Sequence, residues 1–167
     1  VGRGSNLLLN VPPDRRGLLH ENDVKALLEW RKLLDETFET NLALHARAKA
    51  DSYRGKSKKY APSNVTDANP ETYWATNDEI TRGELIIDLG ESKPVKFVLI
   101  QEYIRLGQRI KGFGIDVWAD KQWKEMCTST TIGYKRIMKI DPVETSKIRI
   151  RITDARACPV ISNVEIY

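Results

Sequence analysis

Residues 147–153, KIRIRIT, alternate strictly between isoleucine and a polar or basic residue. Successive side chains of a β-strand point to opposite faces, so this pattern predicts a strand with one buried and one solvated face. The buried face would hold Ile148, Ile150 and Ile152. The solvated face would hold Lys147, Arg149 and Arg151.

Further strand signals recur along the chain after residue 41, with turn residues between them. They are GELIIDLG (83–90), KFVLIQEYI (96–104), FGIDVWA (113–119) and NVEIY (163–167). In the third segment, Phe113, Ile115 and Val117 share one face. Short strands at this spacing are typical of a two-sheet β-sandwich, and residues 41–167 are enough for one domain of that kind.

The first forty residues have a different pattern. Residues 5–11, SNLLLNV, form an apolar run that ends at two prolines, which predicts a fully buried strand. Asn22 or Asp23 offers an N-cap for a helix that reaches about Glu39, with apolar residues on one face. A buried strand followed by a helix is one βα unit, which needs more of a parallel sheet around it. We therefore predict a boundary near Asn41, with residues 1–40 belonging to a larger domain.

Composition and charge exclude several classes of function. No apolar run of the 167 residues is long enough to span a bilayer, so we expect no membrane span. The net charge of +4 gathers in residues 47–59, which we interpret as a solvated loop because no nucleic-acid motif accompanies it. Cys127 and Cys158 lack metal-ligand spacing and are predicted to be separate, partly buried thiols. Residues 1–20 show no signal peptide.

Three motifs resemble one family of enzymes. GSNLLLNVPPDRRG (4–17) resembles the eighth barrel strand and following loop of the family 29 glycoside hydrolases, the α-L-fucosidases. In the usual form, G-G-N-L-L-L-N-V-G-P, glycines stand where this chain has Ser5 and Pro12. QEYIRLGQRI (101–110) and TTIGYKRI (130–137) resemble the domain appended to those enzymes, a discoidin-like or coagulation factor 5/8 type C jelly roll akin to family 32 carbohydrate-binding modules.

The resemblance implies a mainly β protein: residues 41–167 as a discoidin-like jelly-roll β-sandwich, preceded by one βα unit (1–40) left from a (β/α)₈ barrel. The family hydrolyses terminal α-L-fucosides with retention, using two carboxyl groups about 5 Å apart. Those groups lie on barrel strands that this sequence does not contain, so no catalytic residue is assigned and the chain alone is expected to be inactive. Asp14 and Glu21 are interpreted as surface charges.

The same resemblance gives expectations about partners and location. The partners would be the missing catalytic barrel and fucosylated or galactose-containing glycans, with self-association through residues 1–40 and no nucleic acid. The location would be periplasmic or extracellular. Three roles stay open for the sandwich: a carbohydrate-binding module, a structural scaffold for the barrel, or a protein-interaction discoidin domain.

The segment SNVTDANPETYW (63–74) has the loop pattern that binds a structural calcium ion in discoidin-like modules. The resemblance implies a calcium shell of loop oxygens closed by a carboxylate on the last strand: Asn64, Asp67, Asn69, Thr72 and Glu165. Calcium binds several hard oxygens, which such a loop supplies. The alternative is that the loop residues only form Asx-type turns.

A sugar site is a further expectation at the loop end of the sandwich. Sugar recognition needs an aromatic ring and a few polar groups, and the candidates are Glu102, Tyr103, Gln108, Arg109 and Tyr134. The alternative, which we favour, has Glu102 pairing with Arg109 or Arg136 to brace two hairpins, or docking the sandwich on the barrel. Trp74, Trp118 and Trp123 are predicted to be core or inter-sheet packing residues.

Overall fold

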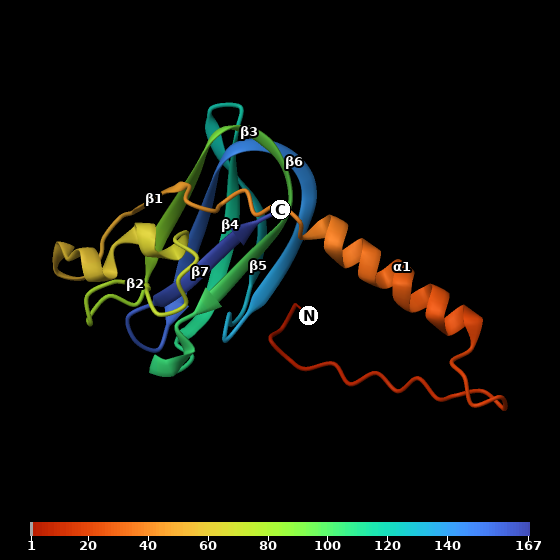
Figure 1. The fold of residues 1–167 in the computed structure, drawn as a ribbon. Helices are drawn as coiled ribbons and strands as arrows, with labels where there is room; N and C mark the ends of the chain where they lie inside the picture. Colours follow the sequence, from red (N-terminus) through yellow and green to blue (C-terminus); the bar gives the residue numbers. More distant parts are fainter. Residues whose placement is uncertain (1) are drawn as a thin grey trace.

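The computed structural model describes residues 2–167 as a β-sandwich with one helix and an extended N-terminal segment beside it (Figure 1). The helix is α1 (Glu21–Thr37), and short 3₁₀ turns lie at Arg54–Lys56, Lys58–Tyr60, Pro62–Val65 and Ile104–Leu106. The strands are β1 (Arg47–Ala50), β2 (Trp74–Ala75), β3 (Gly83–Glu102), β4 (Ile110–Ala119), β5 (Gln122–Ser129), β6 (Arg136–Ala155) and β7 (Val160–Ile166). The mainly β prediction is confirmed.

Strands β3 and β6 are long and curved, and each contributes to both layers of the sandwich (Figure 1). They pair antiparallel along most of their length, with register shifts between Asp88 and Lys93 and between Val95 and Phe97. The first half of β3 lies between β1 and β6, while its second half lies between β7 and β6. The predicted strands 83–90 and 96–104 are therefore one strand, and the first half of β6 was missed.

The core lies between these layers. The predicted inward residues of β4 and β6 are all buried, as is Trp74. They are Phe113, Ile115, Val117, Ile148, Ile150 and Ile152. Trp118 and Trp123 are half-buried and lie outside the core, so the prediction of core or inter-sheet packing is wrong for them; they form a cross-strand pair between β4 and β5, edge to face with 5.2 Å between ring centroids.

The prediction that Arg149 and Arg151 point into water is wrong. Their side chains are only 21% and 24% exposed, because both guanidinium groups bind the buried carboxylate of Asp116 on β4. Arg149 Nη2 lies 2.6 Å and Arg151 Nε 2.7 Å from Asp116 Oδ2. Burial alone would raise the pKa of Asp116, but the hydrogen bonds from the two arginines bring it below its usual value.

The helix prediction is confirmed, with a different cap. His20 is the N-cap, and its Nδ1 accepts a hydrogen bond of 3.2 Å from the backbone N–H of Asn22. At the other end, Phe38 packs on Phe97 and Tyr167 with ring centroids 5.7 and 5.0 Å apart, which joins the helix to the sandwich.

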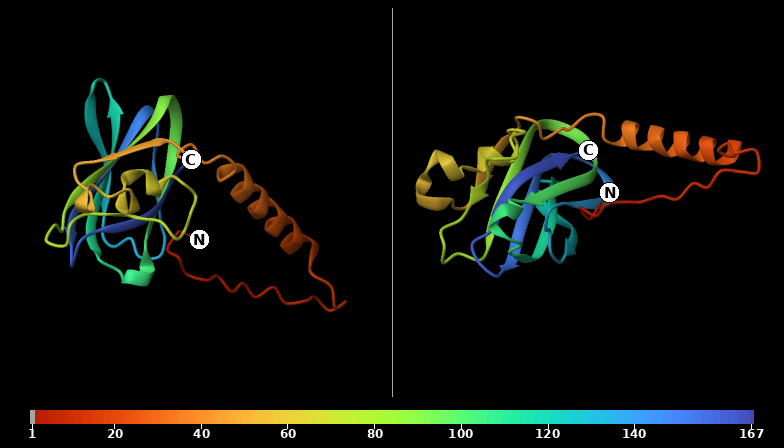
Figure 2. Two further views of the ribbon diagram at one scale, coloured as in Figure 1. Left: turned by 60° about the vertical axis from the view of Figure 1, so that its left-hand side comes forward. Right: turned by 60° about the horizontal axis from the view of Figure 1, so that its bottom comes forward.

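The predicted strand at residues 5–11 is absent, and the remnant of a barrel is not shown. These residues have no strand pairing, and the leucines at 7, 8 and 9 are 60%, 97% and 51% exposed. A parallel strand needs neighbours on both sides to pair its backbone, and the described residues supply none. Figure 2 shows the segment running away from the sandwich and returning through α1.

Candidate ligand site

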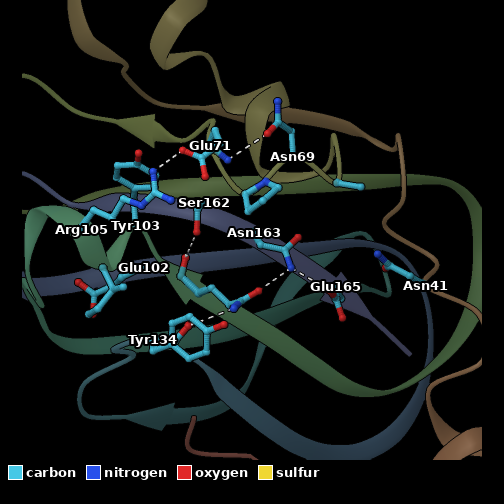
Figure 3. Close-up of a pocket in the computed structure, with 14 residues that line it drawn as sticks. Asn41, Asn69, Glu71, Glu102, Tyr103, Arg105, Tyr134, Ser162, Asn163 and Glu165 are labelled. Carbon is cyan, nitrogen blue, oxygen red and sulfur yellow. Dashed lines mark hydrogen bonds and ion pairs between the residues drawn. The ribbon is translucent and has the colours of Figure 1, made fainter.

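A hollow of about 440 Å³ lies on the outer face of the sheet formed by β3 and β7 (Figure 3). The loop 68–71, the turn 103–105 and Tyr134 surround it. Its floor consists of outward-pointing residues of the two strands, because Val98, Ile100, Val164 and Ile166 point into the core. The floor residues are Gln101, Asn163 and Glu165.

The floor is a connected polar network. Asn163 Nδ2 donates to Gln101 Oε1 and to Glu165 Oε1, both at 2.8 Å. The Tyr167 hydroxyl donates to Glu165 Oε2 at 2.5 Å, and burial together with this hydrogen bond raises the pKa of Tyr167. Both oxygens of Glu165 are therefore already hydrogen-bonded within the strand end.

The rim carries aromatic rings and one ion pair. Tyr103 stacks on Tyr73 with 4.4 Å between ring centroids, and its ring is thereby half covered. Arg105 pairs with Glu71 beside Tyr103, on one side of the hollow (Figure 3). Tyr134, on the opposite side, is 56% exposed. It is the ring on this rim that a ligand can reach most directly.

Glu102 is buried beneath the hollow at 2% exposure and binds main chain. Its Oε1 accepts from the backbone N–H groups of Arg109 (2.7 Å) and Ile110 (2.9 Å), and its Oε2 accepts from that of Gly133 (2.7 Å). The carboxylate thus joins the 104–110 turn to the 130–134 turn. Bracing occurs through backbone amides, and residues 2–167 show no ion pair of Glu102 with Arg109 or Arg136.

The other two predicted sugar residues lie in the same turn. The guanidinium of Arg109 donates to the carbonyl oxygens of Leu106 (3.3 Å) and Cys158 (3.1 Å) and to Cys158 Sγ (2.8 Å). Gln108 is exposed at the turn, outside the residues that line the hollow. Of the five predicted residues, Glu102, Tyr103 and Tyr134 line the hollow.

The predicted calcium loop gathers oxygen atoms around the Thr72 hydroxyl. Thr72 Oγ1 lies 2.7 Å from Asp67 Oδ2, 3.0 Å from the carbonyl oxygen of Asn69 and 3.5 Å from that of Asn64. Two Asx turns also form, with Asp67 Oδ1 and Asn69 Oδ1 accepting from backbone N–H groups. Glu165 and Asn69 line the same hollow, and the Glu165 carboxylate binds Asn163 and Tyr167.

The chemistry of this loop fits a hard cation. Across residues 2–167, no group of three or more His, Cys, Asp or Glu side chains is arranged for a metal. A calcium ion would therefore rely on the Asp67 carboxylate together with carbonyl and hydroxyl oxygens. Such oxygen ligands are compatible with calcium, which accepts six to eight of them.

Sequence reasoning missed most of the polar lining of the hollow. Gln101, Asn163, Glu71 and Arg105 line it without having been predicted. The alternation of QEYI and NVEIY places Gln101 and Asn163 on outer faces, so the signal was present in the sequence. Only the pairing of β3 with β7 brings those faces together.

Residues 47–166 match the F5/8 type C domain, and the chain belongs to this family. The sandwich is thus a discoidin-like domain. Over 100% of its length the chain is 32% identical to "Alpha-L-fucosidase 1" of Arabidopsis thaliana. It spans about a third of the length of the curated relatives it matches.

Solved structures show the same likeness over the whole chain. SpGH29 matches 99% of this chain with a TM-score of 0.92 and 34% identity, and the match covers 36% of that protein. A Ruminococcus gnavus GH29 fucosidase in complex with fucose matches 99% of this chain with a TM-score of 0.89 and 35% identity, over 34% of its own length. These matches confirm the resemblance to family 29 fucosidases.

The sandwich alone has wider relatives in fold. A chitosan-binding module from a Paenibacillus chitosanase/glucanase matches 77% of this chain with a TM-score of 0.69 and 21% identity, which shows a shared fold. Cys127 and Cys158 are separate free thiols, as predicted.

None of the helices at residues 2–167 is both long and apolar enough to cross a membrane.

Proposed function

We propose that this chain is the C-terminal, non-catalytic part of an exo-α-L-fucosidase, and that its sandwich supports the catalytic barrel. The observation that carries the proposal is the exposed, extended apolar segment at residues 5–11. The likeness to fucosidases includes this segment, because the match to SpGH29 covers 99% of the chain. The segment therefore aligns with part of a protein nearly three times as long as this chain.

Three consecutive exposed leucines, Leu7 to Leu9, are unfavourable in an isolated domain because their apolar surface stays in contact with water. Burying apolar surface contributes roughly 25 cal/mol per Å², and contiguous exposed apolar patches mark interaction sites. A second apolar surface lies nearby, a groove of about 480 Å³ between α1 and the sandwich. Trp30, Leu33, Phe38, Phe97 and Ile137 line it. Both surfaces would be covered by the two thirds of the fucosidase length that the chain does not span.

The proposed activity needs carboxylates from that missing part. A retaining glycosidase uses one carboxyl group as the nucleophile and another, with a raised pKa, as the acid. Asp14 is held by Arg16, whose hydrogen bond lowers the pKa of that carboxyl, and Glu21 binds the same guanidinium. An aspartate with a lowered pKa does not suit the role of the acid. A periplasmic or extracellular location belongs to the same proposal.

Leu8→Lys tests the proposal in two proteins: this chain by itself, and the longer protein that the proposal implies. Leu8 is almost fully exposed, so the urea midpoint of the chain by itself should not change. In the longer protein the lysine would be buried in a barrel, so that protein should be less stable. It should also lose fucosidase activity, measured as the release of 4-nitrophenol from 4-nitrophenyl α-L-fucoside.

Gln122→Lys is the matched control, because Gln122 is exposed on β5, away from residues 5–11. It should be neutral in both proteins. An equal effect of Leu8→Lys on the two proteins, or a longer protein without fucosidase activity, would contradict the proposal. Self-association of this chain that Leu8→Lys abolishes would instead assign residues 1–40 to a contact between copies.

Glycan binding in the hollow is a second candidate function. The exposed ring of Tyr134 and the amide groups of Gln101 and Asn163 offer an apolar face and hydrogen-bonding groups side by side. Titration with L-fucose, D-galactose and N-acetyllactosamine, followed by NMR, should shift the resonances of residues 101–105 and 134. Tyr134→Ala should abolish saturable shifts, whereas Gln122→Ala, on the distant β5, should not. If no resonances shift, glycan binding is excluded and support of the barrel is the only proposed function that remains.

The proposal includes a structural calcium ion bound by the 63–74 loop. Asn64, Asp67, Asn69 and Thr72 would hold it in the loop, and Glu165 would have to exchange its bonds with Asn163 and Tyr167 to join them. The bound ion would fix the loop that forms one wall of the hollow.

A further inference from the structure

Arg136 begins β6 with its side chain inside the sandwich. It pairs in register with Ile100, which is fully buried, and its own residue is 9% exposed. Its guanidinium has two neutral partners: Nη2 donates to Ser129 Oγ at 2.6 Å, and Nε contacts Met138 Sδ at 3.4 Å. No carboxylate of residues 2–167 forms an ion pair with it.

The other largely buried arginines of β6 each have a carboxylate partner. Arg149 and Arg151 both bind Asp116, although each is more exposed than Arg136. A buried charge is costly unless it is paired, because it loses its hydration without compensation. Burial lowers the pKa of Arg136, and the positive charge of Arg3 lowers it further. A guanidinium that is buried without a carboxylate partner is a position where an anion is expected.

The N-terminal segment runs directly past this position. The backbone N–H of Ile137 donates to the carbonyl oxygen of Gly2 at 2.9 Å. A Cβ atom on Gly4 would lie 3.1 Å from the ring of Tyr134 and 3.2 Å from the backbone nitrogen of Lys135. Any residues that precede this segment therefore enter next to Arg136.

We propose that Arg136, with Arg3 beside it, binds a carboxylate side chain of the domain that precedes residue 1. The pair would lie at the junction of the sandwich and the barrel, and it would fix their relative orientation. This inference rests on the proposed function, because the barrel is the partner. The planar guanidinium suits a two-oxygen contact with a carboxylate.

The test compares Arg136→Met in this chain and in the longer protein. In this chain the methionine removes an unpaired buried charge, so the urea midpoint should stay unchanged or rise. In the longer protein it would leave the partner carboxylate without its cation, so the midpoint should fall by roughly 1–3 M. Arg149→Met is the matched control and should lower the midpoint in both proteins, because its partner Asp116 is in the sandwich.

The pH dependence separates a carboxylate partner from a packing role. A carboxylate paired with arginine has a lowered folded-state pKa, so its stabilisation is present above the unfolded-state pKa of about 4 and is lost as pH falls through the folded value. The difference between the wild-type and Arg136→Met longer proteins should therefore shrink in acid.

Equal loss in both proteins, failure of the variant chain to fold, or a difference independent of pH would overturn the inference. The Leu8→Lys result and the fucosidase activity decide the proposed function separately, because neither depends on Arg136.

Discussion

Glu102→Gln is the substitution that most directly examines how the two turns beside the hollow are held. The glutamine side chain has the same shape but presents one oxygen and one NH₂ group. The carboxylate accepts from three backbone N–H groups, two at Oε1 and one at Oε2. Glutamine can keep the pair at Oε1 only by placing its NH₂ group against the N–H of Gly133. Two donors then face each other where the original distance is 2.7 Å.

The magnitude follows from these contacts. Hydrogen bonds to a charged group contribute about 1.5–3 kcal/mol each, and a buried donor left without an acceptor costs about 1–3 kcal/mol. Losing the bond to Gly133 leaves one buried N–H unsatisfied, at about 1–3 kcal/mol, and loss of the charge weakens the other two bonds by roughly 0.5 kcal/mol each, so the free energy of unfolding should fall by roughly 2–4 kcal/mol. With a urea m-value of about 2 kcal/mol/M, the unfolding midpoint should fall by about 1–2 M.

Urea unfolding followed by tryptophan fluorescence measures this shift, with Trp74 buried in the core as a reporter. Glu144→Gln is the control, because Glu144 is exposed on β6 and should change the free energy by no more than about 0.5 kcal/mol. If Glu102→Gln behaves like the control, the carboxylate does not brace the turns and the reasoning is refuted.

Two further results are expected. Asp116→Asn should lower the free energy of unfolding by about 3 kcal/mol, because Arg149 and Arg151 lose their shared partner. Since the folded-state pKa of Asp116 is lowered, its stabilisation should be present above about pH 4 and lost in acid, and the variant should flatten this acid limb in urea titrations. Calcium at 100 times its Kd should raise the free energy of unfolding by about 2.7 kcal/mol, and a chelator should reverse the effect. Asp67→Asn should remove the stabilisation. A melting temperature that does not change with calcium would exclude the site.

Local pattern was enough to predict the sandwich. Alternation placed Ile148, Ile150 and Ile152 in the core, since a strand with one buried face requires a period of two. The helix at 21–37 was equally predictable from its apolar spacing. The resemblance carried by the 101–110 and 130–137 motifs was confirmed by relatives that match the whole chain.

Other features depended on contacts between distant segments. No sequence pattern indicates that Asp116 pairs with Arg149, which lies 33 residues away, so the alternation alone predicts solvated arginines. The pairing of β4 with β6 brings the arginines to Asp116. The sequence favoured arginine partners for Glu102, whereas its partners are backbone N–H groups, which every residue but proline carries and no sequence pattern marks.

The sequence by itself determined that this chain forms a two-layer β domain after a helix, because periodicity is a property of neighbouring residues. Only the tertiary structure decided which polar side chains meet. It gathered Gln101, Asn163 and Tyr134 around one hollow, left Arg136 without a carboxylate among residues 2–167, and left the 5–11 segment without a sheet. Those outcomes depend on strand order and register, which the pairing of distant segments sets.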